Sequence, residues 1–198
     1  PLVGGDGAQP IADACDYARH CSALDFWSIN DHAVSIGARR WAETVDTVRQ
    51  CNALAEDSEN PDTVAFLGWE WTQVGSTPET HYGHKNVILR DLEDGKIPTR
   101  PIAATLERGD APVETFTPST FLLGMMSLTE WDTGGPEYTR YIQESYSYHD
   151  CPSGVPVRDL PLDCREVATT PDVLFAKLDD WNLNAMVIPH GTAWGFYT

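Results

Sequence analysis

Three short apolar runs in the chain each lead directly into a residue that can bind a metal ion. Their length and their content of β-branched and aromatic residues are typical of buried strands. A charged or imidazole group directly after such a run is costly to bury without a partner. The runs are 23–30 (ALDFWSIN) before Asp31 and His32, 63–69 (TVAFLGW) before Glu70, and 184–189 (NAMVIP) before His190.

Helical patterns separate these runs. Residues 9–20 and 39–57 place apolar side chains at helical spacing, and Thr170 followed by Pro171 is a typical start of a third helix that extends to about Trp181. Strands that alternate with helices favour an α/β fold with a mostly parallel sheet, either layered or closed into a barrel.

In parallel α/β folds, functional groups gather where the strands end, because the loops there converge on one mouth. We therefore expect His32, Glu70 and His190 to lie at the same mouth. His84 precedes a further predicted strand, 86–89, and can fold back to that mouth. Imidazole and carboxylate ligands suit zinc, manganese or iron, and a carboxylate can bridge two ions. From the residues alone, a metal site and a set of structural polar groups both remain open.

The middle of the chain lacks clear periodicity. Residues 90–118 are rich in proline, glycine and charge, so we expect a long surface excursion. Residues 121–131 and 136–146 are predicted to be helical or mixed. The sequence thus predicts one domain over residues 1–198, with an insertion at about 90–165.

The charge balance excludes some classes of partner. The chain holds 13 basic and 30 acidic residues, a formal net charge of −17. Such a surface repels nucleic acid and anionic membranes, although it suits either a soluble exported protein or the steering of cationic ligands. No apolar run approaches the ~20 residues of a membrane-spanning helix.

The cysteines favour export over a cytoplasmic location. Cys151 and Cys164 bracket a proline-rich loop and are a plausible disulfide. Cys15 and Cys21 can form a second pair or be buried thiols, and an odd total of five leaves at least one cysteine unpaired. A periplasmic or secreted protein is therefore expected.

The segments DFWSINDHA, GWEWTQ, HYGHKNVIL and VIPHG, in that order, resemble the PHP (polymerase and histidinol phosphatase) superfamily. They are most similar to a branch of large, often exported proteins of unknown function. The resemblance implies a distorted (β/α)7 TIM-like barrel with two or three divalent ions (zinc, manganese or iron) at its mouth. It also implies that His32, His84 and His190 are ligands and that Glu70 is the bridging carboxylate.

The family also has a His-x-His motif on its first strand and an Asp-x-His motif on its last, and neither occurs in this sequence. The resemblance therefore implies a barrel that is incomplete at both ends, with the remaining segments of the same barrel as its partner.

The activity that the resemblance implies is metal-dependent phosphoester hydrolysis of a small anionic molecule. Asp31 is expected to orient a histidine or accept a proton. His81 is a candidate ligand, substrate contact or general acid, and Lys85 and Arg90 are candidates for gripping phosphate. Two alternatives stay open: metal-dependent hydrolysis of an amide, lactone or sulfate ester, and a non-catalytic binding barrel.

Overall fold

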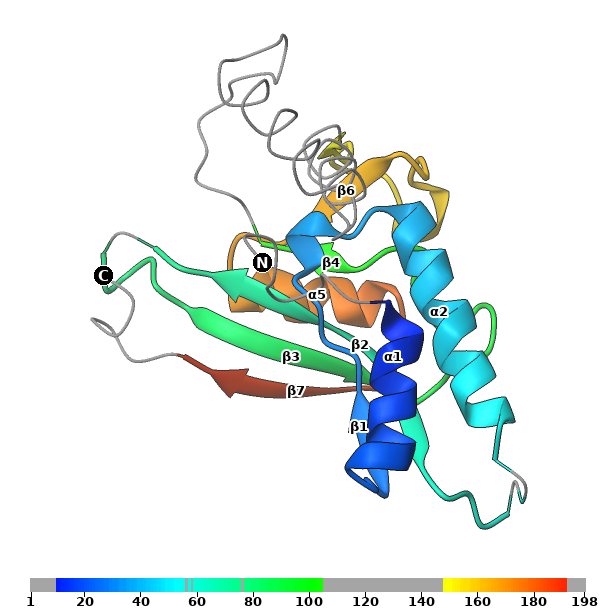
Figure 1. The fold of residues 1–198 in the computed structure, drawn as a ribbon. Helices are drawn as coiled ribbons and strands as arrows, with labels where there is room; N and C mark the ends of the chain where they lie inside the picture. Colours follow the sequence, from blue (N-terminus) through cyan, green and yellow to red (C-terminus); the bar gives the residue numbers. More distant parts are fainter. Residues whose placement is uncertain (1–9, 56, 58, 76, 105–147, 192–198) are drawn as a thin grey trace, which may run out of the picture.

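The computed structural model describes residues 10–55, 57, 59–75, 77–104 and 148–191. It is a mixed α/β structure with a curled four-stranded sheet, in the order β1-β2-β3-β7, and a smaller parallel sheet, in the order β4-β6-β5 (Figure 1). The elements are α1 (Ile11–Asp16), a π-helical turn (Tyr17–Cys21), β1 (Phe26–Ser28), a 3-10 turn (Ala33–Ser35), α2 (Ala38–Ala53), β2 (Val64–Gln73), β3 (Gly83–Leu89), β4 (Ile102–Ala103), β5 (His149–Asp150), a second 3-10 turn (Val157–Asp159), β6 (Cys164–Val167), α5 (Pro171–Asp180) and β7 (Ala185–His190).

The larger sheet is not mostly parallel, and the expectation of a mostly parallel sheet is wrong for it. β1 pairs with β2 in parallel, whereas β2–β3 and β3–β7 are antiparallel pairs. The reason is that only a short connection, residues 74–82, joins β2 to β3, and a parallel neighbour needs a longer crossover. β1, β2 and β7 nevertheless run in one direction, so the three predicted apolar runs still end at the same edge of the sheet. β3 starts at that edge.

One face of β2 forms the core of the domain. The side chains of Leu67, Trp69 and Trp71 alternate along the strand and are fully buried. Trp69 meets Trp41 of α2 edge to face, with ring centroids 5.6 Å apart, and Trp71 donates a hydrogen bond to the Ala168 carbonyl just before α5. These two tryptophans thus connect the sheet to α2 and to the segment just before α5.

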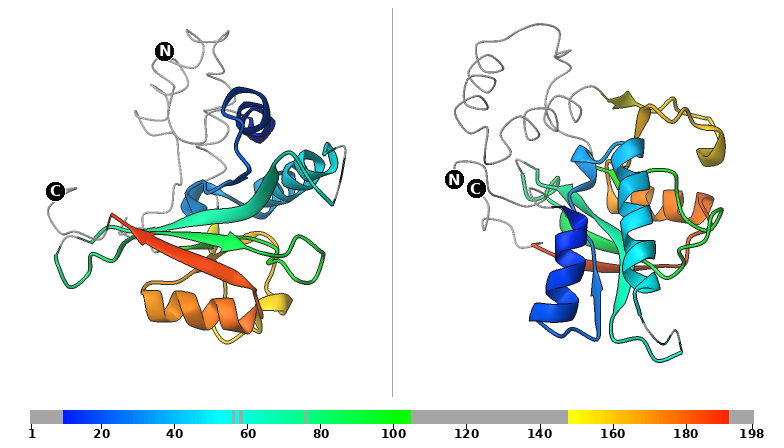
Figure 2. Two further views of the ribbon diagram at one scale, coloured as in Figure 1. Left: turned by 90° about the horizontal axis from the view of Figure 1, so that it is seen from below. Right: turned by 45° about the vertical axis from the view of Figure 1, so that its right-hand side comes forward.

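The opposite face of the sheet is less buried. β1 and β7 were expected to be buried strands, but in the described part of the chain each pairs with a single neighbour. Phe26 on β1 is 69% exposed, and Met186 and Ile188 on β7 are 57% and 43% exposed. Figure 2 shows β7 lying along the rim of the sheet. An apolar run signals a strand, but it does not reveal how many neighbours that strand has.

Two disulfides tie the elements together. Cys15 of α1 is bonded to Cys51 of α2, and Cys151 is bonded to Cys164 of β6. The second pair confirms the predicted one, whereas the alternative pair Cys15–Cys21 is wrong. Cys15 is buried against α2, while Cys21 lies in the following π-helical turn, exposed and with a free thiol. Disulfides form and persist in oxidising compartments.

The helix predicted at Thr170 is confirmed: its hydroxyl caps the first turn of α5 by accepting a hydrogen bond from the Val173 amide. The predicted surface excursion is wrong at its described end, because residues 100–104 are buried and include β4. The helical predictions for 121–131 and 136–146 lie outside the described residues. Within the described residues, no helix combines the length and apolar character needed to cross a membrane.

Candidate metal centre

Strand register gathers the candidate ligands on the open face of the sheet. Directly paired residues point to the same side of a sheet. The antiparallel register pairs Thr72 with His84 and His84 with His190, and an isolated parallel bridge pairs His32 with Glu70. Since Glu70 and Thr72 are two residues apart on β2, all five side chains share one face and one end of the sheet.

The structure brings three of the predicted ligands into one group. The Oε1 atom of Glu70 lies 2.6 Å from Nδ1 of His84 and 3.2 Å from Nδ1 of His32. The candidate ligand atoms of His32, Glu70 and His84 all lie within 4.8 Å of one another. A group of this composition and spacing can hold a metal ion.

His190 lies beside this group. Its imidazole stacks on that of His84 with centroids 5.3 Å apart. Its Nε2 atom lies 3.5 Å from Oε2 of Glu70 and 3.2 Å from Oδ1 of Asn86. The two carboxylate oxygens of Glu70 therefore face different imidazoles: Oε1 faces His32 and His84, and Oε2 faces His190.

Glu70 is held in its ionised form. Burial raises the pKa of this carboxyl group, but hydrogen bonds from Thr72 and His84 and the electrostatic influence of His32 and His84 oppose this effect of burial. The net result is a pKa below the ordinary glutamate value. At neutral pH, Glu70 is a partly buried carboxylate, which is the form that binds cations.

The absence of a side chain at Gly68 lets the end of β1 lie close to β2, which places His32 next to Glu70. A Cβ atom at this position would lie 2.5 Å from Oδ1 of Asn30 and 2.5 Å from the backbone oxygen of Val87. Glycine within a strand often marks such a close approach. Asn30 therefore lies over Gly68, two residues before His32, and fixes the end of β1 next to Glu70.

Glu70 was predicted to follow its strand. Instead, β2 continues to Gln73, and Glu70 lies within it. Asp31 was predicted to orient a histidine or accept a proton, and that role stays a prediction. Its backbone carbonyl accepts a hydrogen bond from the Glu70 amide at 2.9 Å. His81 is buried and lies near the end of β7, with Nε2 3.3 Å from the Gly191 carbonyl.

The structure does not bring Lys85 to the ligand group. Lys85 follows His84 on β3, so its side chain points to the opposite, core face. Its ammonium donates a hydrogen bond to the Tyr82 carbonyl at 2.6 Å and lies 5.0 Å from the ring centroid of Trp71. Burial lowers the pKa of Lys85.

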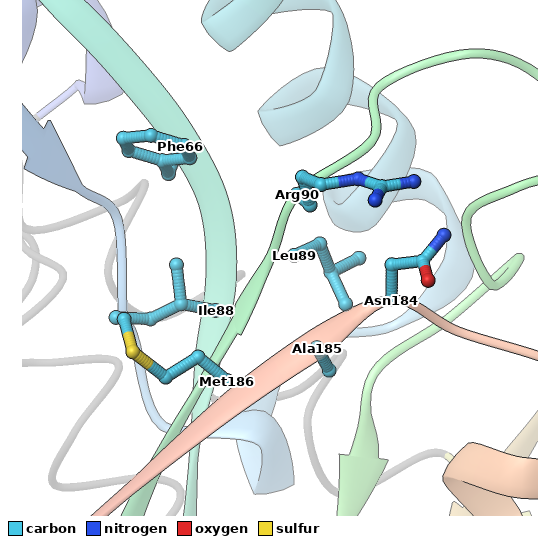
Figure 3. A pocket seen from close by; sticks show the side chains of 7 residues that line it. All are labelled: Phe66, Ile88, Leu89, Arg90, Asn184, Ala185 and Met186. Atoms are coloured by element: carbon cyan, nitrogen blue, oxygen red, sulfur yellow. The ribbon is translucent and has the colours of Figure 1, made fainter.

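Arg90 is at the far end of β3. At roughly 3.4 Å per residue, it lies about 20 Å from His84. It forms the rim of a separate open pocket of about 390 Å³, together with Asn184, over an apolar floor of Phe66, Ile88 and Met186 (Figure 3). Its guanidinium is paired with Asp91 at 3.1 Å. Arg90 and the ligand group therefore belong to different places on the sheet.

Two residues in contact with the ligands were not predicted. Thr72 donates a hydrogen bond to Oε1 of Glu70 at 2.7 Å, and Asn86 contacts His190 as described above. The alternation of side chains along a strand was the available signal, because Thr72 is two residues after Glu70 and Asn86 is two residues after His84.

Comparison with known protein families, with curated proteins and with solved structures finds no match for this chain.

Proposed function

We propose that this chain carries the catalytic centre of a metal-dependent hydrolase that acts on phosphoesters. The observation that carries the proposal is the convergence of the His32, Glu70 and His84 ligand atoms within 4.8 Å of one another. These residues come from three different strands or strand ends. Such a convergence on a partly buried face is costly for a carboxylate unless it serves a cation or a fixed network.

The donor set fits a divalent transition metal. Ligands that share one ion, each about 2.1 Å from it, are themselves roughly 3–4 Å apart. Oε1 of Glu70 lies 3.2 Å from Nδ1 of His32, within this range. Its distance of 2.6 Å from Nδ1 of His84 is that of a hydrogen bond, so these two atoms have to move slightly apart when they share an ion. Two imidazoles and one carboxylate suit zinc, manganese or iron, and they leave coordination positions for water and substrate.

The orientation of Glu70 supports more than one ion. Its Oε1 atom faces His32 and His84, while Oε2 lies 3.5 Å from Nε2 of His190. A carboxylate placed in this way can bridge two ions, and we propose a centre with two or three ions in which His190 belongs to the second position. When bound, such ions acidify water and stabilise negative charge on phosphoryl oxygens.

The residues of the chain have separable roles in this proposal. His32, His84, His190 and Glu70 bind and orient the ions. Glu70 is ionised at neutral pH for the reasons given above, so no proton has to leave it before an ion binds. His81 is the candidate for proton transfer to the leaving group, because it lies against Gly191, directly after His190.

The exposed apolar side chains of the sheet support the proposal that it is part of a larger barrel. Phe26, Met186 and Ile188 are apolar, exposed and on the open face, and β1 and β7 each have one partner among the described strands. Exposed apolar faces and unpaired strand edges favour further pairing. We propose that additional strands of the same barrel pack there. We also infer that the chain is a divergent PHP protein, exported in keeping with its two disulfides.

The test measures the metal content of the protein and its turnover of several substrates in the same set of preparations. The purified chain is stripped of metal, reloaded separately with Zn²⁺, Mn²⁺ and Fe²⁺, and offered phosphomonoesters, phosphodiesters, an amide, a lactone and a sulfate ester. We expect at least one bound ion per chain and turnover of a phosphoester. Turnover of only the other substrates would indicate hydrolysis of a non-phosphate bond. Metal binding without any turnover would favour a binding module.

Variants identify the site responsible. Glu70→Gln keeps the size of the side chain but removes its charge, so we expect it to lose both metal and turnover. The matched control is Glu93→Gln, which changes a glutamate paired with Lys96 beyond the far end of β3. Equal metal content in parent and Glu70→Gln would contradict the proposal.

A further inference from the structure

The hydroxyl group of Thr72 lies at the point where the candidate ligands meet. Its Oγ1 atom is 2.7 Å from Oε1 of Glu70, 3.1 Å from Nδ1 of His32 and 3.1 Å from Nδ1 of His84. These are the same three side chains that form the metal-binding group. Thr72 thus contacts every member of the group, although a neutral hydroxyl is not itself a typical ligand for zinc or iron.

The bonding capacity of a hydroxyl group matches these neighbours. A threonine hydroxyl donates one hydrogen bond and accepts two. In the metal-free protein it donates to the Glu70 carboxylate, which has no proton to give at neutral pH, and it accepts a hydrogen bond from an imidazole whose Nδ1 atom carries a proton. An ion that binds Nδ1 displaces that proton, so these hydrogen bonds orient the side chains before the ion binds. Three polar side chains from three segments of the chain therefore contact the same oxygen atom.

The position of this oxygen is well determined by the backbone. Thr72 lies inside β2 and is paired directly with His84 across the sheet. As a β-branched residue it has few allowed side-chain rotamers. Its hydroxyl is therefore held by the strand itself, whereas Glu70 and the two histidines have longer or freer side chains that need to be oriented.

We propose that Thr72 is a positioning residue of the metal centre, whose hydroxyl group holds Glu70, His32 and His84 in the arrangement that binds the ion. This inference rests on the proposed metal centre. Fixing the ligands lowers the side-chain entropy that is lost when the ion binds, so the effect of Thr72 falls on affinity. Residues that orient metal ligands typically change metal affinity by about 10–100-fold when they are replaced.

The experiment is a titration of the metal-free protein with Co²⁺, followed by visible absorption. Absorption in this range reports both the affinity and the coordination geometry of the ion. Thr72→Val keeps the β-branched shape and removes the hydroxyl group, and we expect it to weaken Co²⁺ binding by about tenfold or more and to alter the spectrum. Thr72→Ser keeps the hydroxyl, so it should bind Co²⁺ more tightly than Thr72→Val and retain the parent spectrum.

Two further variants separate positioning from folding. Thr72→Ala differs from Thr72→Ser by the hydroxyl alone, so this pair decides the question if Thr72→Val does not fold. The matched control is Thr44→Val, which removes the hydroxyl of a buried threonine on α2 that donates to the Arg40 carbonyl. It should leave Co²⁺ binding unchanged.

The outcomes distinguish this inference from the proposed function. A parent protein that binds Co²⁺, together with valine and alanine variants that bind it equally well and with the same spectrum, overturns the positioning role and leaves the metal centre intact. Equal losses in Thr72→Ser and Thr72→Val also overturn it, because the hydroxyl would then not be the cause. A parent that binds no Co²⁺ overturns the metal centre and the positioning role together.

Discussion

The Nδ1 atom of His84 lies 2.6 Å from the Oε1 atom of Glu70, although the register pairs His84 with Thr72 and Glu70 with Asn86. The contact is therefore a diagonal one between adjacent antiparallel strands, of the kind that long side chains on one face can make. It depends on the β2–β3 pairing and not on any sequence proximity of the two residues. The stability of this hairpin and the integrity of the ligand group are consequently linked.

Replacing His84 should weaken metal binding without unfolding the domain. We expect His84→Ala to raise the Kd for Zn²⁺ by at least about tenfold, because it removes one of three clustered ligands. Competition with a chromophoric chelator measures the change. His149→Ala, on β5 of the smaller sheet and exposed, is the control and should bind as the parent does. A His84→Ala protein with parental affinity would place the ion elsewhere.

Gly68→Ala should disturb the site through the backbone. The new Cβ atom would lie 2.5 Å from Oδ1 of Asn30 and from the Val87 carbonyl, so β1 or β3 has to move. We expect a loss of about 1–3 kcal/mol in the free energy of unfolding and weaker metal binding, measured by urea denaturation and by chelator competition. The double variant Asn30→Ala/Gly68→Ala removes only the side-chain clash. Full recovery in that variant would show that the backbone contact is unimportant.

Lys85→Met should change how stability depends on pH. Burial lowers the pKa of Lys85 below its ordinary value of 10.5. As pH rises through the lowered pKa, the folded protein releases this proton while the unfolded chain keeps it until about pH 10.5. The contribution of Lys85 to the free energy of unfolding therefore increases with pH over that alkaline interval. Urea denaturation of parent and Lys85→Met across the interval measures the difference.

We expect the methionine variant to lack this increase and to bind metal as tightly as the parent, since Lys85 faces the core. Identical pH profiles for the two proteins would contradict the assigned burial. A large loss of metal affinity would mean that Lys85 acts at the ligand group after all.

The disulfide between α1 and α2 should contribute strongly to stability. Cys15 and Cys51 are 36 residues apart in sequence, so their bond restricts a long loop in the unfolded chain. We expect Cys15→Ser/Cys51→Ser to lower the free energy of unfolding by about 2–4 kcal/mol. Cys21→Ser removes the exposed free thiol and should leave the urea midpoint unchanged. Equal midpoints for the double variant and the parent would argue against the Cys15–Cys51 bond.

Local patterns in the sequence predicted the helices and strands themselves better than they predicted which of these elements lie next to one another. The helix over α2 and the capped start of α5 were predicted, because spacing and capping act within a few residues. The direction of β3 was not, since it depends on the pairing of β2 with β3. The burial of β7 was overestimated for the same reason: apolar content shows that Met186 and Ile188 can be buried, but not that another element covers them.

The candidate ligands could be predicted because strand ends concentrate functional groups. His32, Glu70 and His84 were expected together, and the structure brings them together. Thr72 was missed, since a threonine in a strand is unremarkable until its cross-strand partners are known. Arg90 was a candidate for gripping phosphate, although an extended strand carries it about 20 Å away from His84.

The connection between Gln73 and Gly83 has a practical consequence for protein engineering. Seven residue pairs hold β2 and β3 in register, and residues 77–80 between them are exposed. An affinity tag or a fluorescent reporter inserted there would lengthen the chain without moving Glu70 relative to His84. A single-residue deletion that slips β3 against β2 would instead turn His84 toward the tryptophans of the core. We therefore expect the protein to tolerate insertions in the turn but not changes of length within the adjoining strand.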